Sequence, residues 1–113
     1  MSFDIIFFDC DSTLSEIEGI DELAERAGCG AEMAALTNAA MNGEVSLESV
    51  YAQRLDLIKP DQQAIDWVAD LYIEKMVQGV EEVFQQLHSQ GKEVHIISGG
   101  IKQAILPLAE KLQ

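Results

Sequence analysis

The chain has 113 residues, 48% of them hydrophobic and 24% charged, and carries a formal net charge of −13 at pH 7. This size and composition suit one modest folded domain and argue against disorder. The negative charge argues against nucleic acid or an anionic membrane surface as a partner. No apolar run approaches the ~20 residues of a membrane span, and the N-terminus lacks the features of a signal peptide. We therefore expect a cytoplasmic protein.

Two segments carry a strand pattern, residues 4–8 and residues 93–97. Both are near-continuous apolar runs, which are typical of parallel strands buried on two faces. Between them the sequence predicts helices, from apolar residues at helical spacing, capping residues, and glycine or proline stops. The first four cover residues 20–27 before Gly28, residues 31–41, a segment from Ser46 to Pro60, and a segment after Asp61. Their predicted inward residues include Ile20, Leu23, Ala24, Ala27, Val50, Tyr51, Leu57, Ile65, Val68, Leu71 and Tyr72.

Two further helices flank the second strand. One carries an apolar stripe of Val80, Val83, Phe84 and Leu87 and stops at Gly91. The other starts after Gly100 and runs through Ile101, Ala104, Ile105, Leu108 and Leu112. Pro107 predicts a kink in the latter or its division in two. The four helices between the strands are much longer than a simple crossover between parallel strands, which needs only a dozen or so residues. The sequence therefore predicts a helical subdomain over residues 15–76, inserted into an α/β core of residues 1–14 and 77–113, with Gly79 as a hinge.

Asp9-Cys10-Asp11-Ser12-Thr13 follows directly after the first predicted strand. Open α/β sheets place their chemistry at this edge, beyond the carboxyl ends of the strands. Two carboxylates held close together repel and raise each other's pKa. They therefore indicate a bound cation, a shared proton or a reaction. The alternative is a turn rich in Asp and Ser that caps a helix.

Residues 7–14 (FFDCDSTL) resemble the first motif of the haloacid dehalogenase superfamily of phosphohydrolases, in the form of its phosphoserine phosphatase branch. Residues 94–100 (VHIISGG) are similar to the second motif, a strand that ends in Ser and is followed by two glycines. The resemblance runs from Phe3 to about Leu112. It implies an α/β fold of the haloacid dehalogenase type: a Rossmann-like parallel sheet, incomplete here, with an inserted four-helix cap. A Lys and further acidic residues would follow Gln113, so we expect the N-terminal portion of a larger enzyme.

The resemblance also implies a reaction, the hydrolysis of a phosphomonoester through an aspartyl-phosphate intermediate. Asp9 would be the nucleophile, and Asp11 would protonate the leaving group and then activate water. The Asp9 carboxylate, the Asp11 backbone carbonyl and a downstream Asp would hold Mg²⁺. The Ser98 hydroxyl and the backbone of Gly99 and Gly100 would bind the phosphate.

Two residues of the predicted cap bear on the substrate. By resemblance, Glu18 would meet a substrate amino group, and Arg54 would meet its carboxylate in a paired contact. The expected substrate is then phosphoserine, in serine biosynthesis, and Met41 would form part of an apolar wall. Read without the resemblance, Glu18 could be an acid at a helix N-terminus, and Arg54 a surface partner of a nearby acid.

Other functions stay open. The protein could be a phosphatase or phosphotransferase for another small phosphomonoester, or a non-catalytic fragment of this fold. A phosphate-accepting signalling module would need five strand–helix units, which the sequence does not offer. Two strands leave unpaired edges and an apolar face, so self-association or strand exchange is also expected. We expect Cys10 and Cys29 to be free thiols, with Cys10 as a small buried filler. We expect His88 and His95 to be structural.

Overall fold

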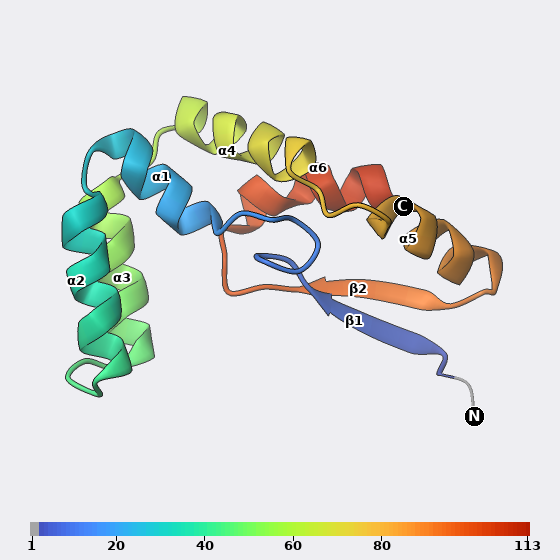
Figure 1. Cartoon of the computed structure of the whole chain (residues 1–113), viewed down its shortest axis with the longest axis horizontal. Helices are drawn as coiled ribbons and strands as arrows, with labels where there is room; N and C mark the ends of the chain where they lie inside the picture. Colours follow the sequence, from blue (N-terminus) through green and yellow to red (C-terminus); the bar gives the residue numbers. More distant parts are fainter. Residues whose placement is uncertain (1–2) are drawn as a thin grey trace.

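The computed structural model describes residues 3–113; residues 1 and 2 of the predicted core segment lie outside it. Its elements follow the predicted order along the chain (Figure 1). They are β1 (Ile5–Asp9), α1 (Gly19–Ala27), α2 (Gly30–Met41), α3 (Leu47–Ile58), α4 (Gln62–Glu74), α5 (Val80–Ser89), β2 (Glu93–Ile97) and α6 (Lys102–Leu112). Of the helices in residues 3–113, none is long and apolar enough to cross a membrane.

The two strands pair in parallel, with Ile5 opposite Glu93 and Asp9 opposite Ile97. Because their register is in step, both strands end at the same edge of the sheet. Helices α5 and α6 lie along one face (Figure 1). Side chains on the other face are open to solvent, with Phe7 58% and Ile97 60% exposed. The prediction of strands buried on both faces is therefore wrong for the described residues, because helices cover only one side.

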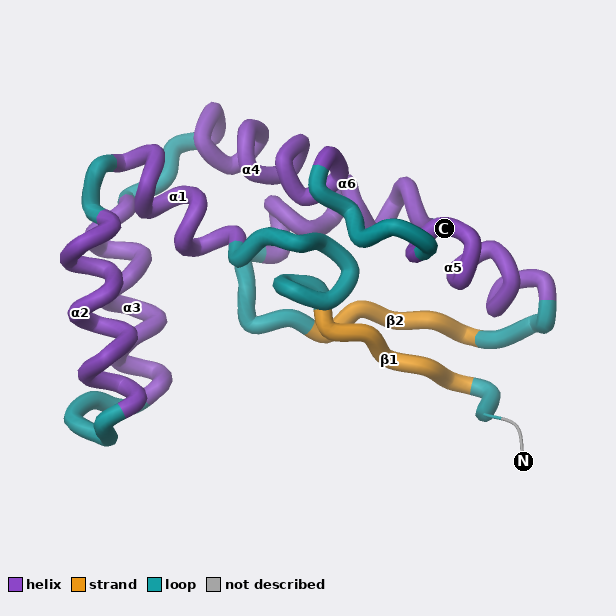
Figure 2. Tube along the Cα trace, viewed as in Figure 1, coloured by secondary structure: helices purple, strands orange, loops and turns teal. Residues whose placement is uncertain are grey.

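The segment between β1 and α5 consists of four helices, of which α2 and α3 form an antiparallel pair that projects at one end (Figure 2). The radius of gyration, 15.7 Å, exceeds the roughly 13 Å of a compact domain of this length. Helix α4 instead packs against α6, and Val68 and Tyr72 share one apolar cluster with Leu108. One core therefore spans both parts, and the division at residues 15–76 stays a prediction.

The helix starts follow the predicted capping residues. The Ser46 side chain accepts a hydrogen bond from the Ser49 N–H at 3.1 Å, and the Asp61 side chain accepts one from the Ala64 N–H at 2.8 Å. At the end of α1, Gly28 has a φ of 78°, a left-handed conformation that glycine adopts without strain. Local signals thus determine where these helices begin and end.

Some predicted inward positions are exposed. Val83, Tyr51 and Leu57 are 47%, 42% and 40% exposed, and Ala27 is exposed as well. Val83, Tyr51 and Leu57 border hollows on the surface, so helical periodicity alone overstates their burial. Pro107 does not divide α6, which runs unbroken from Lys102 to Leu112. The buried stripe of this helix, which includes Ala104 and Leu108, packs in the apolar cluster shared with α4. This packing keeps α6 continuous although Pro107 lacks an N–H.

The chain leaves and returns to the sheet along two adjacent connections. Ser15 and Met76 form an antiparallel bridge, and the Val77 N–H donates to the Leu14 carbonyl at 2.9 Å. Ser15 is fully buried, and its hydroxyl donates to the Tyr72 carbonyl at 2.8 Å. The helical segment is thereby closed at its base. A hinge at Gly79, just beyond this base, stays a prediction.

Candidate active site

The loop after β1 holds the two aspartates at the end of the strand. Asp9 is exposed, and its Oδ1 accepts the Cys10 N–H at 2.9 Å. The Cys10 carbonyl accepts hydrogen bonds from the N–H groups of Thr13, Leu14 and Ser15, at 2.9 to 3.2 Å. The loop therefore turns tightly around the Cys10 carbonyl.

Asp11 is half-buried, and its Oδ1 accepts a hydrogen bond from the Tyr72 hydroxyl at 2.6 Å. Burial raises the pKa of Asp11 above its ordinary value, and the negative charges of Glu18 and Asp9 add to this; the Tyr72 bond acts in the opposite direction. Burial and the neighbouring Asp11 raise the pKa of Tyr72 well above its usual range. The Tyr72 hydroxyl therefore stays a hydrogen-bond donor, and Asp11 is suited to holding and releasing a proton.

Cys10, between the two aspartates, is fully buried. Burial, followed by the charges of Asp11 and Asp9, raises the pKa of its thiol to about 12. The thiol therefore stays protonated near neutral pH and is a poor nucleophile. This environment agrees with the predicted role of a small buried filler.

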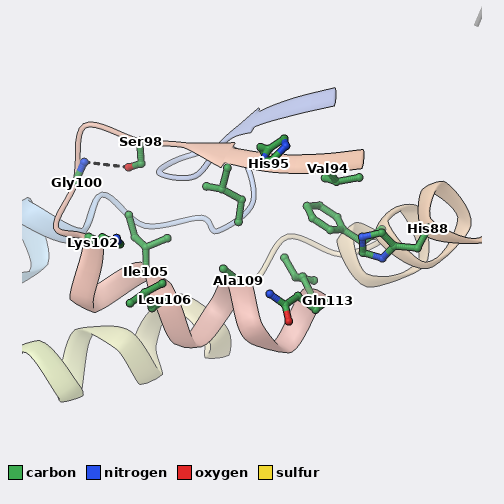
Figure 3. A pocket seen from close by; sticks show the side chains of 13 residues that line it. His88, Val94, His95, Ser98, Gly100, Lys102, Ile105, Leu106, Ala109 and Gln113 are labelled. Carbon is green, nitrogen blue, oxygen red and sulfur yellow. Dashed lines mark hydrogen bonds between the residues drawn. The ribbon is translucent and has the colours of Figure 1, made fainter. Parts of the chain in front are cut away.

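The second motif follows β2 and turns toward the aspartates. The Gly100 N–H donates to Ser98 Oγ at 2.9 Å (Figure 3). A Cβ added at Gly100 would lie 3.2 Å from Ser98 Oγ and 3.6 Å from Asp11 Oδ2. A side chain here would crowd the approach of the two motifs. Helix α6 begins two residues later, and a helix N-terminus offers backbone N–H groups to an anion.

Glu18 and Arg54 reach the same region from the helical segment. Glu18 precedes α1, yet within residues 3–113 its side chain does not cap the helix; instead it accepts a 2.6 Å hydrogen bond from the Ser12 hydroxyl. Arg54 Nη2 donates to Thr37 Oγ1 at 2.8 Å. Its Nε is buried and has no partner among the described residues. Among the described residues, Arg54 forms no ion pair with an acid, so the alternative of a surface ion pair has no support there.

A cavity of about 250 Å³ brings the predicted site residues together, except Met41. It is lined by Asp9, Asp11, Glu18, Gly19, Tyr51, Arg54, Tyr72, Ser98, Gly99 and Gly100, together with Ile20, Leu23, Val68, Ile101 and Ala104. Met41 is 81% exposed and ends α2, at the tip of the α2–α3 pair (Figure 1). The structure does not bring it to the cavity, and its role in an apolar wall has no support here.

A larger cavity of about 420 Å³ lies between β2 and α6 and shares Ser98 and Gly100 with the first (Figure 3). It is lined mostly by apolar side chains, with His88 and His95, and no Asp or Glu is among its described lining residues. The His95 ring stacks on the Phe7 ring with their centroids 5.2 Å apart. The rings of His88 and Phe84 meet edge to face with their centroids 6.2 Å apart. The paired acids mark the smaller cavity as the candidate active site.

Tyr72 is the site residue that sequence reasoning missed. Helical periodicity places it correctly on the inward stripe of α4, where it is 1% exposed. Nothing in the local sequence signals that its hydroxyl meets Asp11, which lies 61 residues away along the chain. Only the packing of α4 over the loop after β1 reveals this contact.

The first comparison is with sequences of known proteins. No protein-family model matches the chain. The chloroplastic phosphoserine phosphatase of Arabidopsis thaliana is 40% identical over 111 residues, which are 98% of this chain and 38% of that protein. The phosphoserine phosphatase of Drosophila melanogaster is 38% identical over 108 residues, which are 96% of this chain and 40% of that protein.

Solved structures agree with the sequences. A phospho-aspartyl intermediate analogue of phosphoserine phosphatase matches with a TM-score of 0.72 and 32% identity, over 99% of this chain and 53% of its own. A substrate-bound phosphoserine phosphatase complex matches with a TM-score of 0.75 and 31% identity, over the same shares of the two chains. The chain is of the haloacid dehalogenase type and resembles the phosphoserine phosphatases.

The predicted α/β fold of the haloacid dehalogenase type is thereby confirmed for this phosphoserine phosphatase-like chain, whereas the inserted four-helix cap stays a prediction. The chain spans about half, or less, of the length of the relatives that it matches. The activity and substrate of the whole protein are therefore matters for proposal.

Proposed function

We propose that the protein containing this chain hydrolyses a small phosphomonoester, with L-phosphoserine as substrate, through an aspartyl-phosphate on Asp9. The observation that carries this proposal is the cavity that unites the Asp9–Asp11 loop, the Ser98–Gly100 turn, Glu18 and Arg54. The printed names of the relatives and of the solved structures support the same activity.

In the first step, an Asp9 carboxylate oxygen attacks the phosphorus atom. The bond between phosphorus and the serine oxygen breaks, and its electron pair stays on that oxygen, which takes the proton from the Asp11 carboxyl. A carboxyl with a raised pKa suits this task, because it holds its proton closer to neutral pH. The products of this step are serine and the Asp9 aspartyl-phosphate.

In the second step, water attacks the phosphorus atom of the aspartyl-phosphate and gives a proton to the Asp11 carboxylate. The bond between phosphorus and the Asp9 oxygen breaks, so that the Asp9 carboxylate and inorganic phosphate are released. Asp11 is then protonated again and ready for the next cycle. Backbone N–H groups near Ser98 and the start of α6 would balance the charge of the phosphoryl oxygens.

The donor set suits a hard divalent cation, because carboxylate and carbonyl oxygens are the ligands that Mg²⁺ prefers. Asp9 and the Asp11 backbone carbonyl would supply two of them. Within residues 3–113 there is no group of three His, Cys, Asp or Glu residues able to hold a metal. When bound, Mg²⁺ would offset the negative charge between the nucleophile and the phosphoryl group.

The choice of phosphoserine rests on Glu18 and Arg54. Leaving the buried Arg54 Nε without a partner costs free energy, and a carboxylate in the cavity would satisfy it. Glu18 lies in the same cavity and can accept hydrogen bonds from an ammonium group. A phosphomonoester that lacks an ammonium or a carboxylate group would leave one member of this pair unused. A cytoplasmic location stays a prediction from the sequence.

The test uses the natural full-length protein, phosphoserine labelled in its phosphate, and the variant Asp9→Asn. We expect the wild type to become labelled on Asp9 when turnover is quenched in acid, and the variant to show neither label nor turnover. Asp4→Asn is a matched control, because Asp4 is exposed and lies at the opposite end of β1. If Asp9→Asn keeps more than a few per cent of the activity, the covalent mechanism fails.

A further inference from the structure

Tyr72 lies where α4 meets the loop after β1, and it is bound to that loop at both its polar ends. Its hydroxyl donates to Asp11 Oδ1 at 2.6 Å, and its carbonyl accepts the Ser15 hydroxyl at 2.8 Å. The residue is 1% exposed. A buried hydroxyl must find a partner, and here the partner is a carboxyl of the candidate active site.

Gly19 makes room for this contact. A Cβ added at Gly19 would come 2.0 Å from the Tyr72 hydroxyl oxygen and 2.6 Å from the adjacent ring carbon. A side chain on residue 19 would therefore displace the ring. The structure combines a tyrosine on α4 with a glycine at the start of α1, and together they admit the hydroxyl to Asp11.

The contact determines which oxygen of Asp11 faces the reaction. Oδ1 is engaged by Tyr72, whereas Oδ2 points toward the second motif, 3.6 Å from where a Gly100 Cβ would be. The proposed phosphoryl group lies between the two motifs. With Oδ1 held, the carboxyl presents Oδ2 to the leaving oxygen. Packing alone would be served equally well by phenylalanine, which lacks the hydroxyl.

We propose that Tyr72 is a positioning residue for Asp11: it holds the carboxyl in the orientation from which Oδ2 gives its proton to the departing oxygen. This inference rests on the proposed function, in which Asp11 is the general acid. The consequence is selective for the first step. Losing the Tyr72 hydroxyl should slow formation of the aspartyl-phosphate only from substrates whose leaving group needs a proton. The value of kcat/KM reports this step, whereas hydrolysis of the aspartyl-phosphate is common to all substrates.

The test compares Tyr72→Phe with wild type in the natural full-length protein on two substrates. Serine leaves phosphoserine as an alcohol and needs a proton, whereas acetate leaves acetyl phosphate without one. We expect kcat/KM for phosphoserine to fall roughly 10- to 100-fold. The value for acetyl phosphate should change by less than about 3-fold. Asp11→Asn should show the same pattern with a larger loss in kcat/KM. Its loss is the upper limit for what the loss of the Tyr72 hydroxyl can cause.

Two further variants separate positioning from folding. Gly19→Ala should reproduce the selective loss, because it displaces the hydroxyl without removing it. Ser15→Ala is the matched control: it removes the other hydrogen bond of Tyr72, so it should lower the thermal midpoint and leave the ratio of the two kcat/KM values unchanged. Equal losses on both substrates, or no loss on phosphoserine, would overturn the proposal for Tyr72. Turnover by Asp9→Asn would instead refute the proposed function, so the two failures are distinguishable.

Discussion

Arg54 is the cationic side chain among the described residues that line the candidate site. Thr37 fixes one end of its guanidinium: the Thr37 hydroxyl accepts from Nη2 at 2.8 Å and donates to the Met33 carbonyl at 3.1 Å. This relay ties Arg54 of α3 to α2. The guanidinium is therefore held in place before a ligand arrives, and little side-chain entropy remains to be lost on binding.

We predict that Arg54→Ala in the full-length protein lowers kcat/KM for phosphoserine, because the substrate carboxylate loses its charge-assisted pair. The loss corresponds to roughly 2–4 kcal/mol of transition-state stabilisation. Phosphoethanolamine, which keeps the amine and lacks the carboxylate, should be hydrolysed at a nearly unchanged rate. Steady-state kinetics on the two substrates measure the difference.

Arg26→Ala is the matched control for this prediction. Arg26 is exposed and lies over the Trp67 ring at 5.4 Å, so its loss removes a cation without touching the cavity. Equal losses on both substrates for Arg54→Ala would mean that Arg54 contacts phosphate or only supports the fold. Amino-acid recognition would then need another source.

The candidate site could be predicted from sequence where its residues stand in short motifs. Asp9, Asp11 and the Ser98–Gly100 turn follow directly after strands, so parallel pairing alone brings them to one edge. Thr37 and Tyr72 could not be predicted. They act through side-chain contacts between elements, and such contacts depend on how whole helices pack.

At the scale of elements, capping residues carry a separable share of the stability. Asp61 accepts the Ala64 N–H at 2.8 Å and places a negative charge at the N-terminus of α4. This helix also carries Tyr72, so its start matters for the site as well as for the fold.

We predict that Asp61→Ala lowers the free energy of unfolding by about 0.5–2 kcal/mol, as for other lost N-caps. Urea denaturation followed by circular dichroism measures it. Asp70→Ala, an exposed position in the middle of the same helix, is the comparison and should cost clearly less. If the two variants lose the same stability, the cap contributes nothing beyond a surface charge.

Helix ends were more predictable than helix faces. Ser46, Asp61 and Gly28 act through bonds to residues a few positions away, so the local sequence is enough to locate them. Burial depends on neighbours that the local sequence does not specify. Val83 continues an apolar stripe yet borders an open hollow, and Phe7 lies on a sheet face that the described helices do not cover.

At the scale of the whole molecule, the open sheet face dominates the surface. Phe3, Ile5, Phe7 and Ile97 are 50–67% exposed, and each strand of the two-stranded sheet has one partner in the described structure. Apolar faces and unpaired strand edges favour association with other chains.

We predict that the 113-residue chain, prepared by itself, self-associates and shows negligible phosphatase turnover even with Mg²⁺. Within residues 3–113, no group of three His, Cys, Asp or Glu residues can hold the metal, and one missing electrostatic contact commonly costs on the order of 10²–10³ in rate. Light scattering and a phosphate-release assay test both parts. A monodisperse, active monomer would contradict the prediction.

A pair of substitutions locates the association. Phe7→Lys should weaken it, because the charge would interrupt the apolar sheet face. Met41→Lys changes a side chain of 81% exposure at the far end of α2 and should leave association unchanged. If the two variants behave alike, the sheet is not the contact surface.

The bridge between Ser15 and Met76 also bears on the order in which the chain folds. β1 and β2 are far apart in sequence, and closing so long a loop costs entropy before any strand bond forms. Once the bridge ties the base of the helical segment, the remaining loop is much shorter, which lowers that cost by about 1 kcal/mol. The helices α1 to α4 can then assemble from local contacts first. Strand pairing, which completes the catalytic edge, would come last.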